Sequence, residues 1–348
     1  MDTAGLAHVR QEITARLTEG RLTKVSNLAL LICSPIGTVP KPHSTSFRTI
    51  HHLSHPCRPG LKLPSVNTGI QLAFVSLQYK SLRPLIDFVC TSPGCWLWKG
   101  DLQDAFRNIV TCLSDARLLG FTFDSVSYRE NALTFGGKSS PWLFNLYAEM
   151  VHWIVSSCLP PGLPLNHYLD NFFRVVPAGE DSSRPVRLLA LTCKALGLAL
   201  SPSKTFFSTK KLEVLGIEID TEALTIGITD THRSSFLCTI QDLLQSNRVS
   251  LLQLQHISGL LQFVTQMAPL GRAYLGRLYA ALRLAHCSPL SQLRLPQPAL
   301  AELRWWCQLL SRWNGLSLLL PSPLCVAPVW IDTCPRGLGG LSWCSGAS

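Results

Sequence analysis

The sequence predicts an α+β fold, and three features predict it. Strand-like segments that contain Pro and Gly run from the end of an N-terminal helix to about residue 70. Residues 163–176 predict a strand, a turn and a second strand, with Asp170 and Asn171 at the tip. From Thr231 onward, apolar residues recur at helical spacing without strands. The 348 residues, 47% of them hydrophobic, can bury a substantial core and form two or three subdomains.

The N-terminal part begins with a predicted short polar helix within residues 1–26. A second helix is expected near Phe74–Val89, before an apolar-rich stretch at 95–100 that predicts a strand ending at Asp101. Residues 142–158 predict a longer helix, because Leu143, Leu146, Met150 and Ile154 share one face. Ser140-Pro141 marks its start and Pro160-Pro161-Gly162 stops it. Another helix is expected over 186–196.

The C-terminal part carries an apolar stripe at helical spacing, formed by Leu251, Leu254, Ile257, Leu260, Leu261 and Val264. Residues 271–277 are expected to begin the next helix, and a further segment runs from Leu303 to Gly315. Val329–Gly340 predicts a strand that carries Asp332.

The net charge of +10 fits a polyanionic partner, because neutralisation of phosphates is the sequence-independent part of nucleic-acid affinity. A basic but ordinary soluble protein is the alternative on composition alone. The thirteen cysteines include no Cys-x-x-Cys pair, which favours free thiols in a reducing compartment. No apolar run approaches the ~20 residues that cross a bilayer, and no secretory signal is apparent. We therefore expect an intracellular protein of the cytoplasm or nucleus, neither secreted nor in the membrane.

Two carboxylate-bearing segments, Asp101–Phe106 and Tyr168–Asn171, resemble the first and third palm motifs of reverse transcriptases. Other segments resemble further motifs of that family, and they occur in the same order along the chain. Residues 34–41 and 47–54 resemble the fingers hairpin, and residues 133–144 resemble the motif in which Phe-Gly is followed by Ser-Pro. Residues 201–205 and 214–220 resemble the closing palm motifs. The wording Asp-Ala-Phe-Arg-Asn-Ile, Asn-Leu-Tyr-Ala-Glu and His-Tyr-Leu-Asp is most similar to DIRS-like retrotransposons, which carry a tyrosine recombinase. The resemblance covers roughly residues 27–345.

This resemblance implies an α+β right-hand polymerase with an antiparallel palm sheet backed by helices, β-rich fingers and a helical thumb. The implied boundaries are an N-terminal helical extension over 1–26, fingers over 27–100, palm with remaining finger elements over 101–230, thumb over 231–290, a connection-like segment over 291–325 and a truncated ribonuclease H start over 326–348.

In the frame of that family, Asp101 and Asp170 are the expected catalytic carboxylates. They would hold two Mg²⁺ ions, or Mn²⁺, with the backbone carbonyl of Leu102 as a further ligand. Asn171 is the departure, because the family usually has Asp there. The amide removes one negative charge, although its oxygen can still ligate a cation. Asn171 is therefore compatible with two alternatives, a polymerase with weakened activity and a degenerate copy of the element that has lost activity.

The remaining expected site residues form the nucleotide pocket. Phe106, within Asp104-Ala105-Phe106, would lie beneath the incoming sugar and exclude a 2′-hydroxyl sterically. Lys41 and Arg48 of the fingers hairpin would grip the triphosphate. Lys204 of the closing motif would either approach the triphosphate or serve as an acid for pyrophosphate. Phe135 and Gly136 would shape the pocket and contact the template. A core position for the aromatic residue and solvated surface positions for the cations are the alternative readings.

The resemblance thus implies an RNA-directed DNA polymerase that uses deoxynucleoside triphosphates and an RNA or DNA template with a primer. Asp332 resembles the first metal ligand of ribonuclease H, but one carboxylate cannot hold two metals, so we expect no ribonuclease H activity. The alternative function is a catalytically inactive, reverse-transcriptase-like nucleic-acid-binding protein from a degenerate element. The oligomeric state is not predicted.

Overall fold

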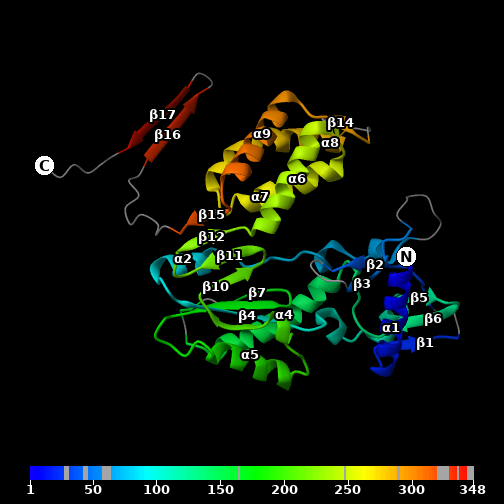
Figure 1. The fold of residues 1–348 in the computed structure, drawn as a ribbon. Coiled ribbons are helices and arrows are strands. Elements are labelled where there is room, and N and C mark those ends of the chain that lie inside the picture. Colours follow the sequence, from blue (N-terminus) through cyan, green and yellow to red (C-terminus); the bar gives the residue numbers. More distant parts are fainter. Residues whose placement is uncertain are drawn as a thin grey trace. The chain divides into compact units, whose positions relative to one another are not determined.

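The computed structural model describes residues 1–26, 31–41, 46–56, 64–160, 162–163, 165–246, 248–287, 291–319, 329–334 and 337–342, the last two ranges by backbone alone. The chain folds into two compact units (Figure 1). The first unit comprises Met1–Leu82 and Cys95–Val214, and the second comprises Arg83–Gly94 and Leu215–Ser348. In the described part of the chain, no helix has both the length and the apolar character needed to span a membrane.

The first unit is built around an antiparallel sheet with the strand order β7-β8-β4-β9. The strands are β4 (Trp96–Asp101), β7 (Leu165–Tyr168), β8 (Asn171–Val176) and β9 (Phe206–Thr209). β4 and β8 pair along their whole length, from Trp96 opposite Val176 to Asp101 opposite Asn171. The predicted strand ending at Asp101 and the predicted strand–turn–strand unit are both confirmed, and they are neighbours in one sheet.

Helices α4 (Ser140–Ser157) and α5 (Arg184–Ala195) lie side by side against this sheet (Figure 1). Pro141 and Pro185 stand in the first turns, where the missing N–H leaves no bond unmade. Phe144, Val151 and Leu189 are buried in the core between these helices and the strands. Both helices agree with their predicted ranges to within two residues.

The N-terminal part of this unit combines a helix with small sheets. Helix α1 (Thr3–Thr18) begins with an Asp2 side chain that accepts a hydrogen bond from the Gly5 N–H, 2.8 Å away. Its Val9 and Ile13 pack on a three-stranded sheet of order β1-β6-β5. This part also contains β1 (Leu22–Lys24), β5 (Gly120–Phe123), β6 (Val126–Glu130) and the hairpin β2 (Ile36–Pro40) and β3 (Phe47–His51). The remaining elements of the first unit are α3 (Leu113–Ala116), β10 (Lys211–Val214), and the short 3-10 helices η2 (Val66–Gly69), η3 (Leu72–Phe74), η4 (Ala105–Asn108) and η5 (Pro202–Lys204), of which β10 and η5 contact β4.

The second unit is mainly helical, as predicted from Thr231 onward. Helix α6 (Asp230–Ser246) packs against α9 (Gln297–Arg312), and α7 (Leu251–Val264) packs against α8 (Gly276–Cys287). Ser250 and Gln253 form a capping box at the start of α7. The other elements are α2 (Arg83–Thr91), η6 (Pro269–Tyr274), β11 (Ile217–Asp220), β12 (Thr225–Gly227), β13 (Arg248–Val249), β14 (Leu293–Arg294), β15 (Leu316–Leu318), and the hairpin β16 (Val329–Cys334) and β17 (Gly337–Ser342).

Two expectations about secondary structure were wrong. The helix expected from Phe74 begins only at Arg83, because Pro84 would clash with the carbonyl of Lys80 in any longer helix and is tolerated only in the first turn. The region after Thr231 is not free of strands, since β13 pairs with β14 and β15 extends β12. Strands of two or three residues carry too little periodicity to be recognised in sequence.

Candidate active site

A cleft of about 670 Å³ opens in the first unit above the ends of β4 and the β7–β8 turn. It brings together ten of the predicted site residues: Lys41, Arg48, Asp101, Leu102, Asp104, Ala105, Phe106, Phe135, Asp170 and Lys204. Gly136 lines an adjacent cavity of about 440 Å³ along the β2–β3 hairpin instead. Predicted site residues as far apart in the chain as Lys41 and Lys204 therefore share one cleft.

One carboxylate ends strand β4, and the other lies in the turn that leads into the neighbouring strand β8. Asp101 is the last residue of β4 and is only 5% exposed. Asp170 lies in the tight turn between β7 and β8, where Leu169 takes a left-handed φ of 52°. The backbone N–H of Leu102 donates to the Asp170 carbonyl at 2.9 Å, which ties the two segments together. Adjacent antiparallel strands thus present both carboxylates at one end of the sheet.

The electrostatics of this pair favour a cation. Burial and the nearby Asp101 charge raise the pKa of Asp170, and Lys204 offsets only part of this effect. The Lys204 Nζ lies 3.4 Å from Asp101 Oδ1, but its side chain is 63% exposed, so its pairing is largely solvated. Two facing carboxylates whose mutual repulsion is not fully compensated are a suitable donor set for a hard divalent ion. The residues present therefore fit magnesium.

Asn171 does not stand at the tip of the turn, where it was expected. It is the first residue of β8, directly opposite Asp101 in the ladder. Its Nδ2 donates to Asp170 Oδ1 at 3.3 Å, and this hydrogen bond lowers the pKa of Asp170. The side chain therefore supports the ionised state of the neighbouring carboxylate. Within the described residues, no group of three or more His, Cys, Asp or Glu side chains is arranged to hold a metal.

The aromatic residue expected to act as the sugar gate lies at the cleft wall. Phe106 is 9% exposed, and its ring packs against Phe135 at 5.0 Å and against Phe144 at 5.7 Å between centroids. It belongs to η4, which follows a left-handed Asp104 with a φ of 51°. The ring therefore belongs to the core and also lines the cleft, so the two sequence interpretations describe one position.

The β2–β3 hairpin is joined to this wall of the cleft. The Arg48 guanidinium lies over the Phe135 ring, 4.8 Å from its centroid. The His51 N–H donates to the Phe135 carbonyl at 2.8 Å. Gly136 has a φ of 106° and lies so close to His51 that a Cβ would overlap its carbonyl oxygen. Only glycine allows this approach of the two backbones.

Sequence reasoning missed the contribution of the N-terminal helix. His8 and Glu12 of α1 line the cleft, as does Arg107 of η4. One signal was present in the sequence, because Arg16 lies at helical spacing from Val9 and Ile13. In the structure, all three residues are buried on the same face of α1. The Asp332 side chain lies outside the described residues, so its assignment stays a prediction.

Comparisons with known proteins agree with this geometry. Residues 39–219 match the family described as reverse transcriptase (RNA-dependent DNA polymerase). The chain is 29% identical over 217 residues to the Gag-Pro-Pol polyprotein of Human T-cell leukemia virus 3 (strain 2026ND), covering 59% of this chain and 14% of the polyprotein.

Solved structures with a similar fold include foamy viral protease-reverse transcriptases. The dRH form in complex with double-stranded DNA has a TM-score of 0.66 and 17% identity, covering 96% of this chain and 52% of that chain. The complex with an RNA/DNA hybrid has a TM-score of 0.61 and 18% identity, covering 90% and 37%. The chain thus spans about half or less of these relatives. The right-hand polymerase fold is confirmed, and because the family match spans more than half of its 348 residues, this chain belongs to the reverse transcriptase (RNA-dependent DNA polymerase) family.

Proposed function

We propose that this chain is the RNA-directed DNA polymerase of a retroelement, extending a primer on an RNA or DNA template with deoxynucleoside triphosphates. One observation carries the proposal, namely that a single cleft holds two facing carboxylates together with the aromatic and cationic residues of the nucleotide motifs. Phosphoryl transfer is catalysed mainly by positioning and by electrostatic stabilisation, and these residues supply both. The motif wording favours a DIRS-like element, and we place the protein in the cytoplasm or nucleus.

Asp101 and Asp170 would hold two Mg²⁺ or Mn²⁺ ions, with the Leu102 carbonyl as a further oxygen ligand. When bound, such ions lower the pKa of the primer 3′-hydroxyl and stabilise the leaving pyrophosphate. Lys204 is close enough to Asp101 to neutralise its charge before an ion enters, and it is exposed enough to move away. Asn171 holds Asp170 through the hydrogen bond from its amide.

The opposite wall of the cleft would select and orient the nucleotide. Phe106 would exclude the 2′-hydroxyl of a ribonucleotide, because its packing against Phe135 and Phe144 leaves the ring no room to retreat. Arg48 and Lys41 would bind the triphosphate. Residues 27–100 would serve as the fingers, residues 101–230 as the palm with the remaining finger elements, and residues 231–290 as the thumb.

A second candidate is a reverse-transcriptase-like protein that binds nucleic acid without catalysis. The specific observation that favours it is Asn171, which replaces an acidic residue directly opposite Asp101. Both candidates predict binding to a primed template, so binding does not separate them.

Primer extension by the purified chain separates the two candidates, with Mg²⁺ and Mn²⁺ compared on one primed template. Asp101→Asn provides the matched control, because it removes the charge and keeps the shape. Extension by the parent and not by Asp101→Asn supports the polymerase. Template binding without extension in either metal supports the non-catalytic protein.

A further inference from the structure

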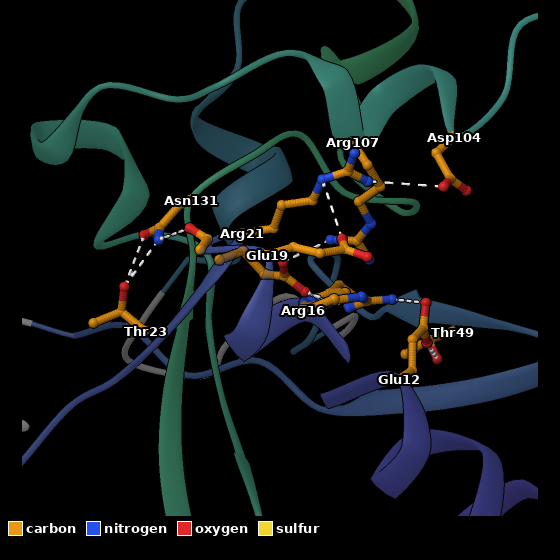
Figure 2. Close-up of polar contacts among 12 residues, drawn as sticks. Glu12, Arg16, Glu19, Arg21, Thr23, Thr49, Asp104, Arg107 and Asn131 are labelled. Carbon is orange, nitrogen blue, oxygen red and sulfur yellow. Dashed lines mark hydrogen bonds and ion pairs between the residues drawn. The ribbon is translucent and has the colours of Figure 1, made fainter. Parts of the chain in front are cut away.

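We use the term nucleotide wall for the side of the cleft formed by Arg48, Phe106 and Phe135. A network of buried charged residues adjoins this wall (Figure 2). At its centre is Glu130, the last residue of β6, which is 0% exposed. Its Oε1 accepts a hydrogen bond from Arg16 Nη1 at 2.7 Å and lies 3.1 Å from His51 Nε2. Its Oε2 accepts from Arg107 Nη1 at 2.6 Å. One carboxylate therefore joins α1, β3, β6 and η4.

A second carboxylate extends the network toward the cleft. Glu12 accepts hydrogen bonds from Arg16 and from the Thr49 hydroxyl, and its side chain also lines the cleft (Figure 2). We use the term buried ionic network for Glu12, Arg16, Thr49, His51, Arg107 and Glu130. Its connections span 114 positions between Arg16 and Glu130 and 37 between Glu12 and Thr49.

The charges of the network balance. Burial alone would raise the pKa of Glu130, but His51, Arg107 and Arg16 lower it to about 2, so the group stays ionised. Burial lowers the pKa of His51, which keeps the imidazole neutral. Two carboxylates therefore face two guanidinium groups. Burial of such charges is expensive, and apolar side chains often stabilise a core equally well, so stability alone does not account for the arrangement.

Three residues of the network are directly connected to the nucleotide wall. Arg107 immediately follows Phe106 in η4, so its ion pair with Glu130 fixes the backbone that carries the ring. Thr49 immediately follows Arg48 in β3.

His51 provides the third connection, through the hydrogen bond from its N–H to the Phe135 carbonyl. Arg107 is also one of the residues that line the cleft. Arg107 Nη2 is buried, and the structure gives it no hydrogen-bond partner within the described residues. An unpaired buried donor costs about 1–3 kcal/mol, a penalty that a purely structural network would avoid.

We infer that the buried ionic network is a positioning device for the incoming nucleotide, through which helix α1 fixes Phe106 and Arg48. Its members are positioning residues, since they act through their neighbours. This inference rests on the proposed polymerase function. It predicts that damage to the network changes nucleotide affinity and sugar discrimination, whereas the carboxylate pair across the cleft continues to support the chemical step.

The primary variant is Glu130→Gln, which keeps the shape of the side chain and removes the charge that holds both guanidinium groups. Its matched control is Asp124→Asn, which breaks the exposed ion pair of Arg10 with Asp124 and so loosens α1 at the surface. Single-nucleotide incorporation on a primed template gives kcat, KM for a deoxynucleotide and the ratio of deoxy- to ribonucleotide incorporation.

For Glu130→Gln we expect KM to rise about tenfold, equivalent to roughly 1.4 kcal/mol, with kcat within about twofold of the parent and a lower deoxy-to-ribo ratio. Asp124→Asn should match the parent in all three quantities. A folded Glu130→Gln with the parent's KM and ratio overturns the inference, and so does a loss confined to kcat.

A milder pair of variants decides the matter if Glu130→Gln does not fold, as judged by circular dichroism. Thr49→Val removes the hydroxyl bound to Glu12 and should raise KM about threefold, whereas Thr49→Ser retains the donor and should restore it. An equal KM in both variants overturns the inference.

Equilibrium dialysis of a labelled deoxynucleotide in Ca²⁺ measures binding without turnover and separates two kinds of failure. A parent that neither extends a primer nor binds the nucleotide refutes the proposed function, and the inference with it. A parent that does both, with Thr49→Val and Glu130→Gln indistinguishable from it, refutes the inference alone.

Discussion

Gly136→Ala tests whether the close approach of two backbones holds the nucleotide wall in place. Gly136 has a φ of 106°, which an L side chain rarely adopts, and a Cβ there would overlap the His51 carbonyl oxygen and lie 3.0 Å from its carbonyl carbon. Neither neighbour can move aside easily. His51 is bound through its N–H to Phe135, and the Gly136 carbonyl accepts from Asn67 Nδ2 at 2.9 Å.

Two penalties set the size of the expected effect. Placing a non-glycine residue at positive φ costs roughly 1–2 kcal/mol. Forcing a methyl group into a filled space costs a further ~1–3 kcal/mol, because the surrounding backbone must shift. The free energy of unfolding should therefore fall by about 2–5 kcal/mol, a large part of the ~5–15 kcal/mol typical of folded proteins. Displacement of Phe135 should also raise KM for the nucleotide.

Urea unfolding followed by circular dichroism measures the change, with Gly37→Ala as the matched control. Gly37 lies in β2 of the same hairpin, and a Cβ there meets nothing within 4 Å, so the control should stay within about 0.5 kcal/mol of the parent. Equal unfolding free energies for Gly136→Ala and Gly37→Ala would refute the reasoning.

Four further predictions address the site itself. Asp101→Asn and Asp170→Asn should each reduce extension roughly 10³-fold, since a catalytic ion contributes several kcal/mol, and an unimpaired variant would show that the ligands are assigned wrongly. Phe106→Val should raise ribonucleotide incorporation relative to deoxynucleotide by roughly 10- to 100-fold, which competition assays with both sugars measure, and an unchanged ratio contradicts the steric gate. Glu130→Gln should lower the free energy of unfolding by roughly 3–5 kcal/mol at pH 7. Because the folded pKa of Glu130 is lowered to about 2, the stability it contributes is present above its ordinary pKa and is lost as the pH falls toward 2, so the difference from the parent should shrink in acid urea titrations. Asn171→Asp should lower the Mg²⁺ concentration needed for half-maximal extension if Asn impairs an active site, and unchanged or lower activity from an active parent would contradict that reading.

The sequence was sufficient to predict the elements that carry strong local signals. Helix α4 has an apolar face and Pro141 in its first turn, and both features act within a few residues. The β7–β8 unit is equally local, since its register follows from a two-residue turn between Tyr168 and Asn171. The start of α2 was misplaced because Pro84 was not weighed against the helical periodicity around it.

The sequence predicted the functional residues that belong to recognisable motifs. It missed the residues that only tertiary contacts bring close to the cleft. Glu130 closes an ordinary amphipathic strand, and nothing nearby in sequence shows that its carboxylate is fully buried. Its partners stand 114, 79 and 23 positions away, in Arg16, His51 and Arg107. A charged residue on an apolar face signals burial with a counter-ion, but the identity of that counter-ion is a property of the fold.

The position of Asn171 shows how a site can gain stability at the expense of its attraction for cations. Asp101 and Asp170 already repel each other, as the raised pKa of Asp170 indicates. A carboxylate at 171 would face Asp101 across the ladder and add a second repulsion to the protein without metal. The Asn171 amide instead donates a hydrogen bond to Asp170 and so offsets part of the repulsion between Asp170 and Asp101. The same hydrogen bond leaves one negative charge fewer to hold two dications, so the argument that favours Asn171 for folding weighs against it for metal affinity. Which effect dominates depends on the free Mg²⁺ concentration, because ions that bind the folded protein stabilise it by an amount that grows with the logarithm of their concentration above the dissociation constant.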